Sequence, residues 1–325
     1  MVGLLALAFC LPGDASGRIP VVVTTDCGVE VDDQWALAHL ALSPRIDLRA
    51  VVTTHAGARN PAAADASAKS AQALLDALPL THRPPVLAGS GSPLNDRKTP
   101  IRNPGVDLLL KESQAGNKGR RVVVLTIGAA TDVASALLLD PAFADRVEVV
   151  AMGFDGWPGG GDSWNVKNDV RAWQVLLDSP APLVVGDARV GKRDLAMTPA
   201  DARRRLEGTG AAGNRLIELL EKWLDGHREL VARTTGNPRQ WPIWDEVTVA
   251  HLLGLTDAEV RPRPTLRDDL SLDHSRPRGS ITWIKSLRTD ALWADLRACL
   301  RPLPLIPDRA CPPRTTTLAV AGRGA

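Results

Sequence analysis

Four carboxylates lie within eight residues near the start of the chain: Asp26, Glu30, Asp32 and Asp33. Like charges packed this closely repel one another unless solvent or a bound cation relieves them. Carboxylate oxygens are hard ligands, which suit Ca²⁺ or Mg²⁺ better than Zn²⁺. Gly28 permits a tight backbone turn, so Asp26 and Asp33 can converge on one ion. The segment therefore indicates a site for a hard divalent cation.

Asp32 and Asp33 also fit a second interpretation, in which these acids only stabilise the start of a helix. The first N–H groups of a helix lack partners within it, and the helix dipole favours acidic side chains there. This interpretation accounts for two of the four carboxylates. A cation site accounts for the acids as a group.

The elements that must position these acids alternate along the chain. Val-rich runs predict strands at residues 21–25, 48–53, 121–126, 147–152 and 183–185, and Ala- and Leu-rich runs predict helices at 33–42, 62–78, 131–139 and 169–177. This alternation favours an α/β fold with a mostly parallel, Rossmann-like open sheet and helices on both faces. Ligands of such sheets bind beyond the carboxyl ends of the strands. Because Asp26 directly follows the first strand, we expect it to lie in that crevice.

We expect a single domain over residues 18–301, with helical additions towards its C-terminal end. After residue 195 the apolar residues keep a helical period through residues 216–231, and residues 246–253 predict a further helix. Residues 302–325 are rich in Pro and predict a disordered tail.

The N-terminal residues 1–17 are typical of a signal peptide or another apolar leader. The leader favours export to the periplasm or the cell exterior, while a cytoplasmic location stays open. In an oxidising compartment Cys299 and Cys311 are expected to pair, which leaves Cys27 unpaired. No other stretch is long and apolar enough to predict a membrane helix.

The charge balance limits the class of partner. The chain has 325 residues, with 39 Lys and Arg against 37 Asp and Glu, and its net charge is +2. Proteins that bind nucleic acids or anionic membranes usually carry a basic patch, and no long run of one sign is present here. We therefore expect a small-molecule partner, no nucleic acid and no membrane.

Indole supplies almost all of the large aromatic surface, since the chain has 9 Trp, 3 Phe and no Tyr. Trp157, Trp164, Trp241 and Trp244 fall in loops that we expect to border the crevice. Indoles can stack on a flat ring and favour it when it is positively charged. Each of these residues also fits plain packing in the core or at its rim.

Short blocks between about residues 20 and 255 resemble the motifs of the nucleoside hydrolases, the inosine-uridine type among them. The first block is the aspartate signature D-x-G-x-x-x-D-D, which starts at Asp26. The others follow in family order: Thr53, Thr54 and Gly57 after the second strand, a G-x-x-T-N segment at 128–132, an E-F-N-x-x-x-D segment at 163–169, and Trp244 before Asp245. Several motifs in order are far more specific than any one of them.

The resemblance implies one Ca²⁺ ion at the floor of the crevice. The positions that match the family's ligands are Asp26, Asp33, the backbone carbonyl of Ile127, and Asp245. A carbonyl ligand requires no particular side chain, so the sequence supports Ile127 least directly.

The resemblance also implies the substrate and the reaction. Asp32 and Asn165 match residues that grip the ribose hydroxyls, and Trp244 lies where the leaving base binds. Cleavage of a ribosyl C–N bond builds positive charge on the sugar, which nearby carboxylates stabilise. Asp26 would act as the general base for a water molecule oriented by the metal. The products would be a free base and ribose, and relatives of this kind commonly form homo-oligomers.

Three positions depart from the family pattern. Ser163 stands where the family has Glu, and the Asn expected after the second strand is Ala58 unless a longer loop brings in Asn60. Trp244 replaces the His that protonates the leaving base in pyrimidine-tolerant members. Some purine-specific relatives also carry Trp there, so we expect purine ribonucleosides as substrates.

The missing general acid is worth about 10²–10⁴-fold in rate. His55, after the second strand, and His227, in a long helix, are the two residues that could replace it, and each also fits a surface or capping role.

Two other functions stay open at this stage. The first is a nucleoside- or sugar-binding protein that kept the fold and the metal but lost leaving-group activation. The second is a Mg²⁺-dependent phosphohydrolase with a strand-end Asp as nucleophile, which predicts a second acid two residues later, where this chain has Gly28.

Overall fold

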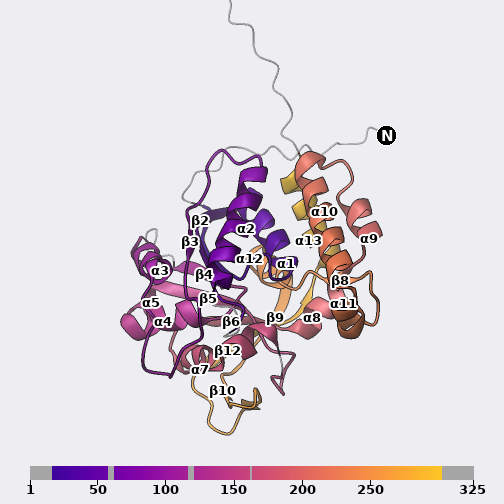
Figure 1. The fold of residues 1–325 in the computed structure, drawn as a ribbon. Helices are drawn as coiled ribbons and strands as arrows, with labels where there is room; N and C mark the ends of the chain where they lie inside the picture. Colours follow the sequence, from indigo (N-terminus) through magenta and orange to yellow (C-terminus); the bar gives the residue numbers. More distant parts are fainter. Residues whose placement is uncertain (1–16, 58–61, 116–120, 162, 302–325) are drawn as a thin grey trace, which may run out of the picture.

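An eight-stranded sheet organises the chain, in the order β3-β2-β1-β4-β5-β6-β12-β9 (Figure 1). The computed structural model describes residues 17–57, 62–115, 121–161 and 163–301. The strands, in sheet order, are β3 (Val86–Ala88), β2 (Ile46–Thr53), β1 (Ile19–Thr25), β4 (Val122–Thr126), β5 (Val147–Met152), β6 (Leu183–Gly186), β12 (Ser280–Leu287) and β9 (Thr256–Pro262). All neighbouring strands are parallel except β12 and β9.

The sheet is buried on both faces. Successive side chains of a strand point to opposite faces, so Val21 and Val23 join one apolar cluster while Val22 joins the other. A strand buried on both sides must be apolar throughout, which explains the Val-rich runs.

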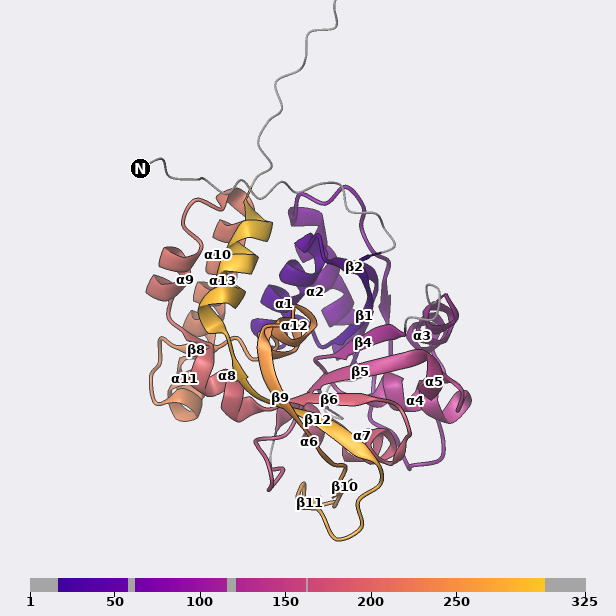
Figure 2. The same cartoon turned by 180° about the vertical axis from the view of Figure 1, so that it is seen from behind.

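Helices cover the two faces as separate groups (Figure 2). The first cluster packs under α1 (Asp32–Leu42), α2 (Ala63–Ala77) and α12 (Glu246–Leu252), with α9 (Pro199–Arg205), α10 (Gly210–Gly226) and α13 (Thr289–Leu300) beside them. The second cluster packs under α3 (Pro104–Gln114), α4 (Thr131–Leu139), α5 (Phe143–Arg146) and α7 (Val170–Asp178). The remaining elements are α6 (Trp164–Asn168), α8 (Ala188–Asp194), α11 (Arg228–Thr235) and the short pairs β7 (Ala196–Met197) with β8 (Trp241–Pro242) and β10 (Thr265–Leu266) with β11 (Leu272–Asp273).

The expected fold class is confirmed, and the predicted strands and early helices all form within a few residues of the predicted bounds. The C-terminal region differs from the expectation of helices alone, because it also supplies β9 and β12 to the main sheet. Residues 256–262 form an edge strand with largely exposed side chains, so they lack the apolar run that marked the central strands. The predicted helix over 216–231 is divided at His227 into α10 and α11.

Several expectations fall outside the described residues. The leader up to residue 16, the tail 302–325, and the partner Cys311 lie there, so the leader, the tail and the pairing of Cys299 stay predictions. Among the described residues Cys27 and Cys299 form no disulfide. Of the helices in the described part, none is both long and apolar enough to cross a membrane.

A buried histidine joins three helices on one face of the sheet. His39 of α1 places Nδ1 2.9 Å from Oε2 of Glu246 in α12, and Nε2 3.1 Å from Oδ1 of Asp295 in α13. Burial lowers the pKa of His39, but the charge of Glu246 and the hydrogen bonds with Asp295, Cys299 and Glu246 outweigh burial and raise the pKa well above its usual value. The imidazole is therefore a cation between two carboxylates.

The raised pKa of His39 predicts that the folded state becomes less stable as the pH rises. A His with a raised pKa in the folded state stabilises the fold fully below its unfolded pKa of about 6.5, and that contribution is lost as the pH rises through the folded pKa. In metal-free protein, we expect the free energy of unfolding measured in urea to decrease from about pH 6.5 upwards.

The variant His39→Gln provides the comparison. It leaves Glu246 buried without its cation, so we expect it to be about 3–5 kcal/mol less stable at about pH 6. Its stability should also fall less steeply with rising pH. An unchanged slope in this variant would assign the pH dependence to other groups.

Candidate active site

A cavity of about 500 Å³ lies beyond the carboxyl ends of β1, β4, β5 and β6. It is lined by the seven residues that the family resemblance matched to the metal, the sugar or the base: Asp26, Asp32, Asp33, Ile127, Asn165, Trp244 and Asp245. Half-buried Glu30 lines it as well. The fold thus brings together residues from both ends of the sequence.

The turn after β1 places the first acids. Gly28 has a φ of +91°, and a Cβ at this position would lie 2.4 Å from Oγ of Ser70, so glycine suits the turn both in conformation and in space. The turn closes with a hydrogen bond of 3.0 Å from the N–H of Val29 to the carbonyl of Asp26. Helix α1 then begins at Asp32, so Asp32 and Asp33 stand in its first turn, where the helix dipole favours acids.

Three buried carboxylates form a compact cluster. Oxygen atoms of Asp32, Asp33 and Asp245 all lie within 4.8 Å of one another. Asp245 joins the cluster from the start of α12, far along the chain. Asp26 is buried beside them, and the hydroxyl of Thr25 donates a hydrogen bond to Asp33.

Burial and mutual repulsion disfavour the charged form of these acids. Burial raises the pKa of Asp26 to about 7, against an opposing hydrogen bond from Trp164. Burial, with the charge of Asp26, raises the pKa of Asp32 to about 7. The pKa values of Asp33 and Asp245 rise well above their usual range through burial and then through the charges of the neighbouring aspartates. A divalent cation would relieve this repulsion.

The donor atoms fit a hard cation. The cluster offers carboxylate oxygens, and the carbonyl of Ile127 borders the same cavity. That carbonyl accepts a 2.9 Å hydrogen bond from Nδ2 of Asn165, and its second lone pair remains for a further partner. Burial and the charge of Asp33 raise the pKa of the Cys27 thiol well above its usual value, so Cys27 is neutral and supplies no thiolate. An all-oxygen set suits Ca²⁺ or Mg²⁺.

Asn165 is fixed by the backbone around it. Its Nδ2 donates to the carbonyls of Ile127, at 2.9 Å, and Met152, at 3.2 Å, which occupies both amide hydrogens. Its Oδ1 is therefore the atom left to accept a hydrogen bond from a molecule in the cavity.

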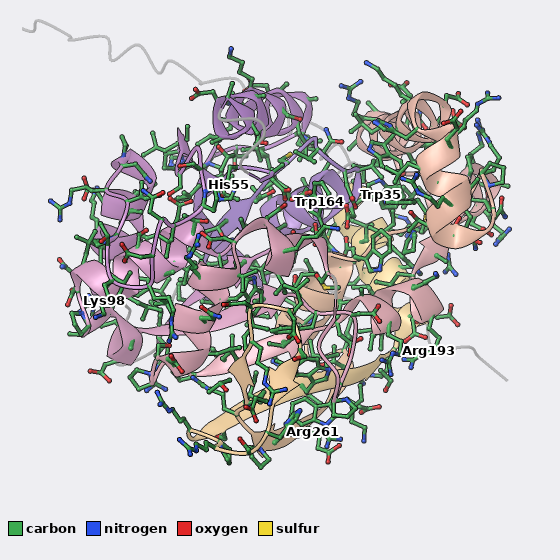
Figure 3. The ribbon with its side chains drawn as sticks, turned by 60° about the horizontal axis from the view of Figure 1, so that its bottom comes forward. Trp35, His55, Lys98, Trp164, Arg193 and Arg261 are labelled. Atoms are coloured by element: carbon green, nitrogen blue, oxygen red, sulfur yellow. The ribbon has the colours of Figure 1, made fainter. Side chains whose placement is uncertain are left out.

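Trp164 has a role that the sequence did not reveal. Its Nε1 donates to Oδ2 of Asp26 across 3.3 Å, and the indole is 40% exposed at the start of α6 (Figure 3). The sequence predicted that Trp164 borders the crevice, but it did not indicate a hydrogen bond to Asp26. The contact holds the Asp26 carboxylate in one orientation.

An aromatic wall faces these acids. The rings of His227, Trp223, Trp241 and Trp244 follow one another with centroid separations of 4.6, 4.3 and 4.9 Å, and all four line the cavity. Trp223 was missed because its position on the apolar face of α10 indicated only core packing. Trp157 was expected at the crevice but is not among the residues that line the cavity, because its ring packs on Trp283 at 5.1 Å.

The two candidate histidines lie in different surroundings. His55 is buried, with Nε2 2.8 Å from Oγ1 of Thr131 and Nδ1 accepting from the N–H of Gly57. Burial lowers its pKa to about 4, and it does not line the cavity. His227 does line it, and its Nδ1 lies 2.8 Å from the carbonyl of Trp223. Because that carbonyl can only accept, Nδ1 carries the hydrogen and Nε2 is left for another partner.

The other motif positions mostly hold loops in place. Asp132 accepts hydrogen bonds from Ser90 and Asn103. Asp169 accepts from the hydroxyl of Thr131 and from backbone N–H groups. Ser163 lines the cavity where a Glu was expected, and the alternatives Ala58 and Asn60 lie outside the described residues.

Comparisons with known proteins agree with this geometry. The family model described as "Inosine-uridine preferring nucleoside hydrolase" matches residues 21–287. A plant nucleoside hydrolase structure is 17% identical with a TM-score of 0.69, covering 88% of this chain and 100% of its own. A purine-preferring ribonucleoside hydrolase from Gardnerella vaginalis is 16% identical with a TM-score of 0.68, covering 86% and 98%.

An inosine-uridine preferring nucleoside hydrolase from Bacillus anthracis is 13% identical with a TM-score of 0.65, covering 87% of this chain and 99% of its own. No curated protein is similar enough in sequence to match. The structural likenesses, at these identities, support the fold, while the family model spans most of the sequence. The chain therefore belongs to the inosine-uridine preferring nucleoside hydrolase family, whose enzymes hydrolyse N-glycosyl bonds.

Proposed function

We propose that this protein is a Ca²⁺-dependent purine ribonucleoside hydrolase. The observation that carries the proposal is the buried cluster of Asp32, Asp33 and Asp245, with Asp26 beside it, facing an aromatic wall across one cavity. Asp26, Asp33, Asp245 and the Ile127 carbonyl would hold the ion. Bound Ca²⁺ would orient a water molecule and lower its pKa.

The chain's own residues would carry the proton and stabilise the charge. Asp26 accepts the proton of the attacking water, whose oxygen forms the new bond to the anomeric carbon as the C–N bond breaks. The bonding pair leaves with the base, which gains a proton from solvent. The surrounding carboxylates stabilise the positive charge that develops on the sugar. Asp32 and Oδ1 of Asn165, which both line the cavity, would accept hydrogen bonds from the ribose hydroxyls.

The aromatic wall supports a purine as the leaving base. Trp223, Trp241 and Trp244 offer large flat surfaces, and stacked indoles favour a ring that carries positive charge. A purine can be protonated at N7, whereas a pyrimidine has no equivalent site. The printed description of the Gardnerella vaginalis relative also names a purine preference.

A binding protein without turnover is the second candidate, because Trp244 stands where other members carry a general acid. Turnover of inosine separates the two. Two observations argue against a phosphohydrolase. Gly28 stands where that mechanism requires a second acid, and the matching family model describes nucleoside hydrolases.

The proposed ion can be tested by metal analysis and by its effect on stability. Dialysed protein should retain about one Ca²⁺ per chain, because relief of buried repulsion favours tight binding. Chelation should lower the free energy of unfolding by about 3 kcal/mol, as expected for an ion present at about 100 times its Kd. Elemental analysis and urea titrations measure both.

The matched variants for this test are Asp245→Asn and Asp155→Asn. Asp245 belongs to the cluster, whereas Asp155 is exposed and lines the same cavity outside it. Only Asp245→Asn should lose the ion. If elemental analysis found no divalent cation in dialysed wild-type protein, a resident ion would be ruled out.

Another prediction concerns Asp26. Asp26→Ala removes the general base and a metal ligand together, so kcat/KM for inosine should fall by at least about 10²–10⁴-fold. Circular dichroism should remain unchanged. Near wild-type activity in this variant would show that another group is the base.

Substitution of Trp164 should have a smaller effect at the same site. Trp164→Phe removes the hydrogen bond to Asp26 and keeps an aromatic ring beside Lys167, so we expect a loss of about 10-fold, which is the low end for a hydrogen bond to a charged group. Trp157→Phe is the control, because this indole packs outside the cavity. Equal effects of the two changes would contradict the role of Trp164.

A further prediction concerns the base. We expect kcat/KM for inosine to exceed that for uridine by as much as about 10²–10⁴-fold, the value of one general acid. Steady-state assays of base release with both substrates measure the ratio. Equal values would mean that a protein group protonates the leaving base.

His227 is the group to examine in that case, since it lines the cavity and His55 does not. His227→Gln should then slow release of hypoxanthine from inosine. It should leave unchanged the hydrolysis of p-nitrophenyl riboside, whose leaving group needs no proton. An effect on both substrates would indicate a binding or structural role.

A further inference from the structure

A second set of metal-ligating side chains lies between α1 and α13, outside the cavity. Asp295 and Cys299 are four residues apart on α13 and so share one helix face. His39 approaches that face from α1. It follows Asp33 by six positions, roughly 9 Å along the helix. This group is therefore separate from the acids at the start of α1.

We propose that His39, Asp295 and Cys299 bind a Zn²⁺ ion. One ligand atom from each of these residues lies within 4.8 Å of the other two. Nε2 of His39 is 3.1 Å from Oδ1 of Asp295, and that oxygen is 3.8 Å from Sγ of Cys299. Ligands around a tetrahedral zinc with bonds of 2.0–2.3 Å are themselves about 3.3–3.8 Å apart. Small side-chain shifts would bring all three atoms into coordination.

The surroundings orient these ligands as metal sites usually require. Glu246 lies 2.9 Å from Nδ1 of His39, which fixes a hydrogen on Nδ1 and directs Nε2 towards α13. A carboxylate behind a histidine in this way is a common support of zinc ligands. Arg45 lies 3.9 Å from Oδ2 of Asp295, so Oδ1 is the oxygen that faces the histidine.

The ligand types select the metal. One imidazole, one carboxylate and one thiolate suit zinc, whereas the all-oxygen cluster at the other end of α1 suits a hard cation. Binding releases the proton of Nε2 and the proton of the Cys299 thiol to solvent. The Asp295 side chain is 28% exposed, so the fourth position is accessible to water.

The site would tie the active centre to the C-terminal helix. Glu246 directly follows Asp245, and it contacts His39, which a bound zinc would fix against α13. Without a metal, the same three residues form the hydrogen-bonded cluster around the His39 cation. The two states differ in whether a proton or a metal occupies Nε2.

Cobalt titration of the full-length protein tests the proposal. The protein is reduced with a phosphine and kept in Ca²⁺, so that the oxygen cluster does not bind the added ion. Co²⁺ bound by a thiolate absorbs in the near ultraviolet through sulfur-to-cobalt charge transfer. We expect this band to saturate at about one Co²⁺ per chain and to disappear when Zn²⁺ is added.

Single substitutions locate the thiolate. Cys299→Ser should abolish the band, while Cys27→Ser and Cys311→Ser should keep it. Glu246→Gln should weaken Co²⁺ binding by about 10–100-fold, as expected for loss of the carboxylate behind a ligating His. These variants avoid replacing the fully buried His39.

Three results would overturn the proposal. They are the absence of the band in the reduced wild-type protein, its persistence in Cys299→Ser, and its loss in Cys311→Ser, which would assign a thiolate to the tail instead.

Discussion

Repulsion between buried carboxylates is the constraint on which this structure depends. Asp26, Asp32, Asp33 and Asp245 lose their hydration together, and each disfavours the charge of the others. The fold offsets part of this cost with the N-terminal ends of α1 and α12, whose dipoles favour negative charge. A cation bound at the cluster would relieve most of the remaining repulsion. The same ion would connect segments that are distant in sequence.

The parallel sheet makes this arrangement available. Every parallel strand ends at the same edge, so the turns after β1, β4, β5 and β6 meet around one cavity. The strand interiors need only be apolar on both faces, and the chemistry is confined to the residues that follow them. The helical C-terminal region completes the cavity, because Trp223 of α10 and His227, between α10 and α11, belong to its aromatic wall.

The sequence predicted the parts of the fold that rest on local pattern. Buried central strands produce Val-rich runs, and a strand end followed by acids predicts where those acids lie. It did not predict β9, because an exposed edge strand such as Thr256–Pro262 carries mostly polar side chains and is defined by its pairing with β12. It also missed β12, which lies inside the sheet between β6 and β9.

The same limit applies within the site. Residues in ordered motifs, such as Asp26 and Asn165, lie around one cavity as expected. The position of an isolated aromatic ring depends on packing, so nothing local separated Trp164, which contacts Asp26, from Trp157, which contacts Trp283. His55 and His227 likewise differ only in the surroundings that the fold gives them.

The two cysteines of the described chain show how surroundings decide metal preference. Cys27 lies beside the acidic cluster, where burial and the charge of Asp33 oppose formation of a thiolate. A thiolate is therefore disfavoured beside that cluster, and a hard ion bound there would meet oxygen ligands. Cys299 lies instead close to an imidazole and a carboxylate, those of His39 and Asp295, a set of ligand types that suits zinc. One helix, α1, thus contributes acids to an oxygen site at its start and a histidine to a softer site two turns later. Asp245 belongs to the acidic cluster and the next residue, Glu246, contacts His39. One peptide bond therefore joins a residue of the first site to a residue that supports the second.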